Sequence, residues 1–368
     1  MENLIVKELT ELSWNVPESQ YRADKAVSYS TLSTFAREGI KGLRKIIVEG
    51  VKLDTASLRH GSAVDTLLTD KENFNSLYLI SNYNKPSDLI KSIVDLVWQT
   101  SDKTCNNLKK INQTTLLQHI DTIGYGASNW KPETKINKVI DEGNDYFQLL
   151  PLTMDGKQLL HQSDYDYVIK CVDSLYTNPY TSWIFDTSNP NVKVYFQLKF
   201  KMSFSEFGML HPMAWKDQLL EENTIRCMFD IIVVDYENKT IHPIDLKTTS
   251  HNEEDFDLSI QDWYYDLQAT MYSFILREIC KSDEYFKDFK VLPFSFLPIN
   301  KFNLNPQLYE YSTSISDIQK PFRDYKGLIH RAWYNYLKKV RWHISNNEYR
   351  YKMETVLNNG INKINFVI

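Results

Sequence analysis

The stretch CMFDIIVVDYENKTIHPIDLKTTS, residues 227–250, predicts a β-hairpin in the second half of a 368-residue chain. The runs Ile231–Val234 and Ile241–Ile244 have the length and apolar character of buried strands. Residues 235–239 between them are polar and indicate a tight turn. The stretch therefore predicts two neighbouring antiparallel strands with polar residues at their ends.

Asp230, Asp245 and Lys247 are expected to meet at one edge of this hairpin. Alternate residues of a strand face the same side, so Asp245 and Lys247 point one way while Leu246 points into the core. Carboxylate oxygens suit a hard divalent cation, and a neighbouring lysine can orient or activate a water. Because Asp-x-Lys is short and is usually a surface ion pair on a solvated strand, the flanking elements decide its interpretation.

Two amphipathic helices are expected upstream of the hairpin. Segment 27–47 has Ser30 or Thr31 as its N-cap. Segment 57–69 has apolar residues at helical spacing and small residues near its start. The small residues would let this second helix lie close to a sheet.

Segment 253–280 is the clearest helix of the sequence, with acidic residues in its first turn. Gln268 and Tyr272 are four residues apart and so share one helix face. Gln261 and Tyr265 repeat the same spacing seven residues earlier, which leaves two registers for this pair.

The remaining elements are expected as follows. Residues 80–190 are helical, with helices near 86–99, 103–120, 132–150 and 163–176; residues 191–200, 289–299 and 307–314 are strands; residues 322–348 are a final amphipathic helix. The order around the hairpin is thus helix, three strands, helix, strand.

This series of motifs resembles the PD-(D/E)xK phosphodiesterase superfamily, in its RecB-like and phage-exonuclease branch. Gly61, Leu67 and Leu68 match that family's G-x-x-x-H-x-L-L helix, with Asp65 at the position of the family's metal-contacting histidine. Gln268 matches the glutamine of its Q-x-x-x-Y motif. The resemblance covers residues 27–75 and 190–300 and no more.

The resemblance implies an α/β fold with a restriction-endonuclease-like αβββαβ core, a mixed central sheet flanked by helices, a helical insertion and a C-terminal helix. The expected domains are an N-terminal extension over 1–26, a nuclease domain over 27–348 that includes the insertion at about 80–190, and a tail over 349–368. The implied activity is that of a metal-dependent DNA exonuclease.

The resemblance also implies a role for each site residue. Mg²⁺ or Mn²⁺ would be held by Asp230, Asp245, the Leu246 backbone carbonyl and Asp65; the catalytic set would be Asp230, Asp245, Lys247, Gln268 and Tyr272. The implied substrate is linear duplex DNA with free ends, in phage-type recombination or replication. A single-strand annealing protein and a second copy of the chain are the other partners that the resemblance suggests.

The sequence departs from the family where a glutamate is common on the first core strand. Here the strand offers Lys193 and Gln197, and Glu206 follows in the next segment. Two other interpretations therefore stay open. One is a catalytically inactive DNA-binding or assembly protein of the same fold, and the other is an interaction protein whose hairpin is an ordinary surface ribbon.

Composition sets the remaining limits. The net charge of −5 argues weakly against a protein that coats DNA with a basic surface, and a nuclease would gather its lysines and arginines around one groove. The four cysteines are widely spaced, which predicts free thiols and excludes a clustered iron–sulfur site. No signal peptide or membrane span is apparent, so the expected location is the cytoplasm, that of the host if the gene is from a phage.

Overall fold

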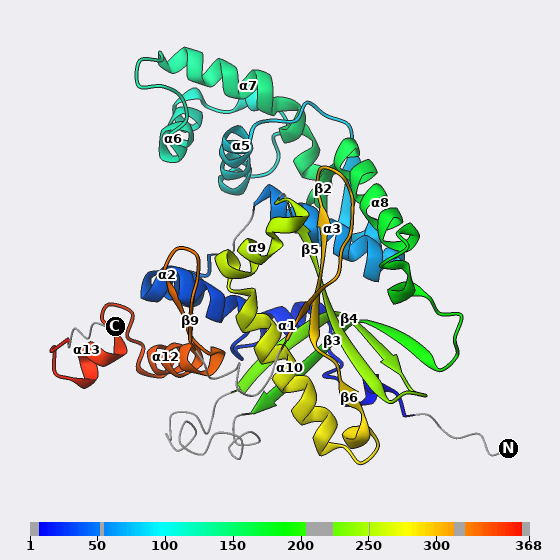
Figure 1. The fold of residues 1–368 in the computed structure, drawn as a ribbon. Helices are drawn as coiled ribbons and strands as arrows, with labels where there is room; N and C mark the ends of the chain where they lie inside the picture. Colours follow the sequence, from blue (N-terminus) through cyan, green and yellow to red (C-terminus); the bar gives the residue numbers. More distant parts are fainter. Residues whose placement is uncertain (1–6, 52–54, 204–223, 250, 313–320, 363–368) are drawn as a thin grey trace. The chain divides into compact units, whose positions relative to one another are not determined.

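The computed structural model of the chain describes residues 7–51, 55–203, 224–249, 251–312 and 321–362. It is a mixed α/β protein whose chain divides into two compact units (Figure 1). The first unit comprises Met1–Leu53 and Ser174–Ile368, and the second comprises Asp54–Asp173. The second unit is thus inserted in sequence between two segments of the first.

A six-stranded mixed sheet forms the centre of the first unit, in the order β3-β4-β5-β7-β8 with β6 also beside β5. Its strands are β3 Val192–Ser203, β4 Thr224–Asp235, β5 Thr240–Thr249, β6 Lys290–Val291, β7 Phe294–Asn300 and β8 Tyr309–Tyr311. The β3–β4, β4–β5 and β7–β8 pairs are antiparallel, whereas β6 and β7 run parallel to β5. The predicted hairpin and the strand at 191–200 are confirmed.

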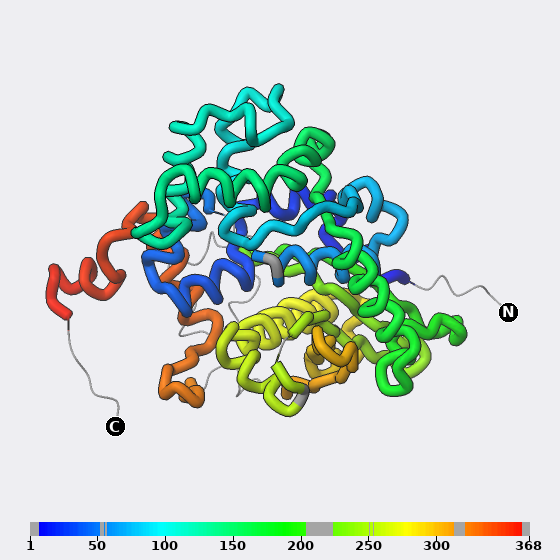
Figure 2. The backbone as a smooth tube through the Cα atoms, turned by 90° about the horizontal axis from the view of Figure 1, so that it is seen from above, coloured from blue at the N-terminus to red at the C-terminus, as the bar shows by residue number. Residues whose placement is uncertain are grey.

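Helices α2 Tyr29–Ile47, α9 Phe256–Trp263, α10 Tyr265–Ser282 and α12 Trp333–Asn346 share one hydrophobic core with this sheet. The first unit also contains α1 Glu18–Ala23 and α13 Met353–Leu357, with 3-10 turns η1 Leu9–Leu12, η5 Ser182–Phe185, η8 Glu253–Asp255 and η9 Phe286–Asp288. The helix α10 connects β5 to β7, and α2 packs on both α10 and α12. Figure 2 shows α2 in blue beside the orange and red C-terminal helices.

The side chain of Asp235 stabilises the turn between β4 and β5 by accepting hydrogen bonds from backbone amides of the turn. Its Oδ1 accepts hydrogen bonds from the amides of Glu237, at 3.0 Å, and Asn238, at 2.9 Å. Lys239 closes the turn in the left-handed region at φ 50°. This Asx-type geometry fixes the register of the hairpin and so the relative positions of Asp230 and Asp245.

The predicted single helix over 253–280 is wrong in one respect, because it is broken into α9 and α10. Tyr264 separates them in the left-handed region, at φ 58°. Its ring stacks on the His330 imidazole with 4.0 Å between ring centroids. Packing on a residue far away in sequence thus favours a conformation that no local pattern indicates.

The predicted helix over 322–348 is also wrong in its first third. Phe322–Arg323 (β9) and Ile329–His330 (β10) form a short antiparallel hairpin, and the helix α12 begins only at Trp333. Gly327, at φ 76°, and two amides bonded to Asp324 close the turn. An aspartate–glycine turn therefore prevails over the helical spacing of apolar residues.

The N-terminal segment packs on the sheet of the first unit. The Trp14 amide donates to the Lys199 carbonyl at 2.7 Å, and Val27 forms a parallel bridge to Ile225. The N-cap of α2 is Ser28, rather than the expected Ser30 or Thr31, and its Oγ bonds the Ser30 hydroxyl. Residues 9–27 thus cover the β3–β4 side of the sheet.

The second unit is mainly helical. Its elements are α3 Ala56–Thr69, α4 Phe74–Leu77, β1 Tyr78–Ser81, α5 Asp88–Thr100, α6 Gln113–Ile123, α7 Pro132–Leu149, β2 Gln158–His161 and most of α8 Gln162–Thr177, with 3-10 turns η2 Lys71–Asn73, η3 Leu108–Lys110 and η4 Leu150–Thr153. The helices α5, α6 and α7 share a core of their own, and β1 pairs with β2 in parallel. This parallel ribbon has no counterpart in the sequence-based expectation. In the described residues, no helix combines the length and apolarity that crossing a membrane requires.

Candidate active site

The predicted site residues lie where the central sheet divides. The β4–β5 ladder runs from Asp235↔Thr240 to Ile231↔Ile244 and stops there. Beyond that point β4 remains paired with β3, while β5 remains paired with β7. Asp230 and Asp245 are the next residues in register, so they face each other where the two strands begin to separate.

The Asp230 side chain connects β4 to β5 beyond the point where the backbone pairing of these strands ends. Its Oδ2 accepts a hydrogen bond from the Leu246 amide at 2.9 Å. The N–H and C=O of a residue within a strand point toward the same neighbouring strand. Since the Leu246 N–H points toward β4, its carbonyl points to the same side, past the end of the β4–β5 ladder.

The Asp245 carboxylate is almost completely buried, with 2% of the residue exposed. Its Oδ2 pairs with the Lys247 ammonium, and its Oδ1 accepts a hydrogen bond from the Gln268 amide nitrogen. Gln268 is itself 4% exposed and projects from α10. One carboxylate thus joins the end of β5 to the helix that crosses to β7.

Lys247 lies between two negative or electron-rich groups. Its Nζ pairs with Asp245 and lies 4.8 Å from the centroid of the Tyr265 ring. Burial would lower the pKa of Lys247, but attraction to Asp245, Tyr265 and Asp230 outweighs it and holds the pKa above its usual value. The amine is therefore a fixed positive charge, suited to holding an anion or a polarised water.

Tyr265, the tyrosine of the Gln261/Tyr265 pair, also lies at the site, because the Lys247 ammonium lies over its ring. Tyr265 lies three residues before Gln268, so the two share a face of α10. Its ring also lies 6.4 Å from the Tyr29 ring of α2. Burial raises the pKa of the Tyr265 phenol, so it remains protonated at neutral pH. The i, i+3 spacing was the signal that could have identified Tyr265.

Tyr272, by contrast, lies in the hydrophobic core. Its ring packs against Phe229, with 5.1 Å between centroids, and against Phe294, at 6.1 Å. Burial raises its pKa well above the usual value. Tyr272 thus packs α10 on the sheet, and the charges of Asp245 and Asp230 also act on its phenol, so its catalytic role stays a prediction.

The first core strand contributes Gln197. The pairs Phe196↔Ile231 and Leu198↔Phe229 place it across from Asp230 in the β3–β4 register. It adopts φ 52°, which is uncommon for any residue other than glycine and costly within a strand. The register thus places a glutamine, rather than an acidic residue, opposite Asp230, whereas Lys193 pairs with Glu8.

Asp65 belongs to the second compact unit, on α3, and is half-buried. Its role as a metal ligand stays a prediction. Glu206 lies outside the described residues. The helix α2 shares a hydrophobic core with the central sheet, and α3 belongs to the other compact unit.

The described residues contain no group of three or more His, Cys, Asp or Glu side chains arranged to hold a metal. Mg²⁺ needs fewer, since it is usually bound by one or two carboxylates and keeps several waters. Asp230, Asp245 and the Leu246 carbonyl supply oxygens of this kind at the end of the β4–β5 ladder. The donor set therefore fits a single hard cation, which would compete with Lys247 for Asp245.

No family model matches the chain, and no curated protein matches it at a significant level.

Proposed function

We propose that the protein is a divalent-metal-dependent nuclease that hydrolyses phosphodiester bonds in DNA, with the core of the PD-(D/E)xK fold. The order α2, β3, β4, β5, α10, β7 supports the fold, since it follows the αβββαβ pattern of that core. The observation that carries the proposal is the Asp245 carboxylate, bonded by Lys247 and Gln268 at the point where Asp230 faces it.

The chemistry of the site follows from this arrangement. A Mg²⁺ or Mn²⁺ ion held by Asp230, Asp245 and the Leu246 carbonyl would supply Lewis acidity toward the phosphate and its attacking water. Lys247, released from Asp245 when the cation binds, would hold the water or the negative charge on the phosphate oxygens. Gln268 would keep the Asp245 carboxylate in its orientation throughout.

An exonuclease that processes linear duplex ends is the form of activity we propose. Such an enzyme leaves single-stranded DNA, so a strand-annealing protein is the partner that its product would suit. This part rests on the resemblance of the motifs and not on the site geometry.

One assay tests both the activity and its form. The full chain is incubated with end-labelled linear and circular duplexes in Mg²⁺, Mn²⁺ or EDTA. We expect degradation of the linear duplex with either metal, none with EDTA, and an intact circle. Cleavage of the circle would make the protein an endonuclease, while an intact linear duplex with both metals would contradict nuclease activity.

Gln197 favours one other candidate, a DNA-binding or assembly protein of the same fold without activity. The amide replaces a carboxylate next to Asp230 and so removes one negative charge from the site. If this candidate is correct, the protein binds duplex ends but Gln197→Glu and wild type alike leave them uncut.

A further inference from the structure

Three consecutive aromatic residues at the α9–α10 junction each contact a basic side chain. The Arg37 guanidinium carbon lies 4.9 Å from the Trp263 ring, the Tyr264 ring stacks on the His330 imidazole, and Lys247 lies over Tyr265. The left-handed Tyr264 turns these three side chains in different directions. Tyr265 thus faces the carboxylate site, whereas Trp263 faces solvent with 47% of its surface exposed.

Arg37 presents a partly open guanidinium beside Trp263. Its Nε donates to the Ser33 carbonyl at 3.3 Å. Among the described residues, no hydrogen bond or ion pair engages its two terminal nitrogens. A planar guanidinium with free terminal nitrogens suits a phosphate, and an exposed indole suits a nucleobase.

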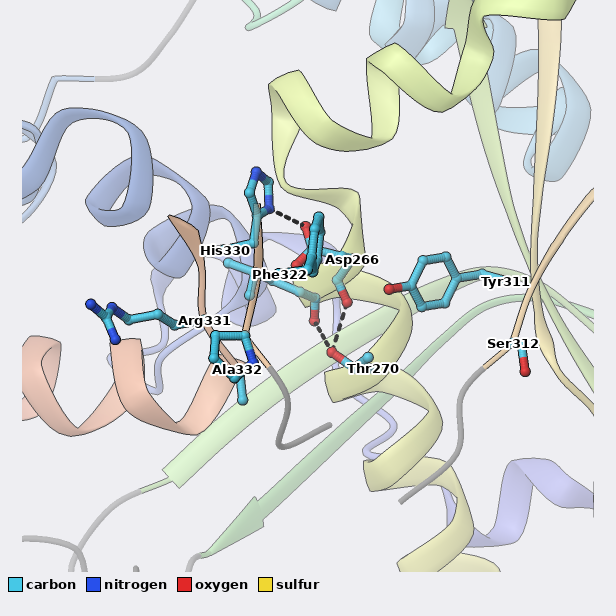
Figure 3. Close-up of a pocket in the computed structure, with 10 residues that line it drawn as sticks. Asp266, Thr270, Tyr311, Ser312, Phe322, His330, Arg331 and Ala332 are labelled. Carbon is cyan, nitrogen blue, oxygen red and sulfur yellow. Dashed lines mark hydrogen bonds and ion pairs between the residues drawn. The ribbon is translucent and has the colours of Figure 1, made fainter. Parts of the chain in front are cut away.

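The β9–β10 hairpin extends this surface with more residues of the same kinds. Tyr325 is 53% exposed, and the Lys326 ammonium lies 5.0 Å from its ring centroid. Arg323 and Arg331 are exposed on the same hairpin. Arg331 also lines the neighbouring cavity, and in Figure 3 its side chain extends away from the other labelled residues.

Direct contacts fix the hairpin beside Trp263. The Tyr325 hydroxyl donates to Asp262 Oδ1 at 2.9 Å, and Lys326 Nζ donates to the same oxygen at 2.7 Å. The Tyr325 amide donates to Gln261 Oε1 at 3.0 Å. Asp262 immediately precedes Trp263 in the chain, so these contacts hold the hairpin at the end of α9 that carries Trp263.

A buried network anchors the hairpin from below. His330 is fully buried, with Nδ1 3.1 Å from Asp266 Oδ1 (Figure 3). Its Nε2 lies 3.4 Å from Asp324 Oδ2. Its ring lies between those of Tyr264 and Phe322. The exposed aromatic and basic side chains are therefore carried on a fixed support, which lowers the entropy lost when a ligand binds.

A cavity of about 330 Å³ lies behind this support, lined by Asp266, Thr270 and Tyr311 among others (Figure 3). Ser312 and Pro321, which flank a segment outside the described residues, also line it. We assign no ligand to it.

We propose that Arg37, Trp263, Arg323, Tyr325, Lys326 and Arg331 form a binding surface for a single-stranded segment of nucleic acid. Exposed aromatic faces stack on unpaired bases, and the interspersed cations contact the backbone. The surface reaches the candidate active site through Tyr29, whose hydroxyl donates to the Trp263 carbonyl at 2.8 Å and whose ring faces Tyr265. Only this link to a scissile phosphate rests on the proposed function.

Fluorescence anisotropy with a labelled oligothymidylate in EDTA tests the surface without cleavage. We expect Trp263→Ala and Tyr325→Ala each to weaken binding by about 5- to 100-fold, the range measured for base–aromatic stacking. Arg323→Ala and Arg331→Ala should each lower the slope of log K against log salt by about 0.7. Trp263→Phe, which keeps an aromatic face, should restore most of the affinity and so exclude misfolding.

Matched controls lie elsewhere in the same unit. Tyr180, 80% exposed, provides an aromatic control, and Arg350, paired with Glu348 at 3.1 Å, provides a charge control. Tyr180→Ala and Arg350→Ala should leave the affinity within about twofold, as expected of surface substitutions. Equal losses in these controls would overturn the proposal, as would unchanged binding by Trp263→Ala or tighter binding of polyglutamate than of the oligonucleotide.

The outcomes separate this surface from the proposed activity. Binding that depends on Trp263, with no cleavage in any metal, would uphold the surface and reject the nuclease. Cleavage with an unchanged KM in Trp263→Ala would do the reverse.

Discussion

The helix α10 carries a buried carboxylate network on each of two faces, and the two differ in what they leave open. On one face Asp245 pairs with Lys247, whose side chain is 18% exposed. On the other, Asp266 pairs with His330, which is fully buried between two aromatic rings. The first pair thus has a partly exposed cation, whereas the second has a fully buried imidazole and borders the cavity of about 330 Å³.

The surroundings of the two carboxylates differ because of their positions in the fold. Asp245 lies where β4 and β5 separate, so one edge of its surroundings lacks a neighbouring strand. Asp266 lies under a hairpin whose turn is closed by Asp324. A buried charge pair is weak evidence for stability by itself, and here the openness of the backbone around it separates a candidate reaction site from a structural contact.

Asp245→Asn should produce the largest effect. The substitution keeps the shape but removes the charge that attracts both Lys247 and a cation, so cleavage of linear DNA should fall by about 10³-fold or more. Rates in Mn²⁺ with end-labelled duplex measure this. Asp266→Asn, on the other face of α10, is the matched control and should lower the rate far less.

His330→Ala should lower the stability of the protein and leave the carboxylate site at Asp245 unchanged. Two buried carboxylates would lose their common partner, and the free energy of unfolding should fall by about 3 kcal/mol. Urea unfolding followed by fluorescence measures this loss, with His330→Gln as the variant that keeps a hydrogen bond. Mn²⁺ affinity at the other face should not change, and a loss of both properties would contradict the separation of the two networks.

The hairpin and the sheet beside it were predictable because their signals are local. An apolar run, an Asx turn and strand alternation place Asp230, Asp245 and Lys247 at one edge without information from distant residues. Gln268 was predictable for the same reason, since helical spacing fixes its face. The mixed α/β class followed from the order of these elements.

The errors occurred where residues distant in sequence decide the local conformation. The break at Tyr264 depends on the ring of His330. The turn at Gly327 is a different case, because its signal, capping by Asp324, is local and was outweighed by the helical spacing of the apolar residues around it. Gln268 and Tyr272 were preferred over Gln261 and Tyr265 because Ala269 follows Gln268 as in the family's motif. That local signal does not indicate that Tyr265 lies over Lys247. The positive φ angle of Gln197 has no signal in the sequence and is seen only in the structure.

Tyr265 allows a finer test of the open network. Tyr265→Phe keeps the ring face over Lys247, while Tyr265→Leu removes it, so only the leucine variant should lower the cleavage rate, by about 2- to 5-fold for a lost cation–π contact. Steady-state rates at saturating DNA compare the two variants. Equal losses in both would assign the role to the hydroxyl instead.

His242 provides a partly buried base that bonds a hydroxyl instead of a carboxylate. Its Nε2 lies 2.8 Å from Ser295 Oγ, and burial lowers its pKa from 6.5 to about 4. The unfolded chain therefore binds the extra proton between these values, so stability is fully present above pH 6.5 and falls as the pH drops toward 4, by about 2 kcal/mol. Urea unfolding across this range should show the loss in wild type and not in His242→Gln.

The central claim is that Asp230 and Asp245 hold a cation in place of Lys247, which then acts on the substrate. Calorimetric titration of Mn²⁺ into wild type and Lys247→Ala, with cleavage measured on the same preparations, tests it most directly. We expect the variant to bind Mn²⁺ at least as tightly, because a competitor for Asp245 is gone, while cleavage falls by about 10²-fold or more. Absence of Mn²⁺ binding in wild type, or undiminished cleavage by the variant, would contradict the account.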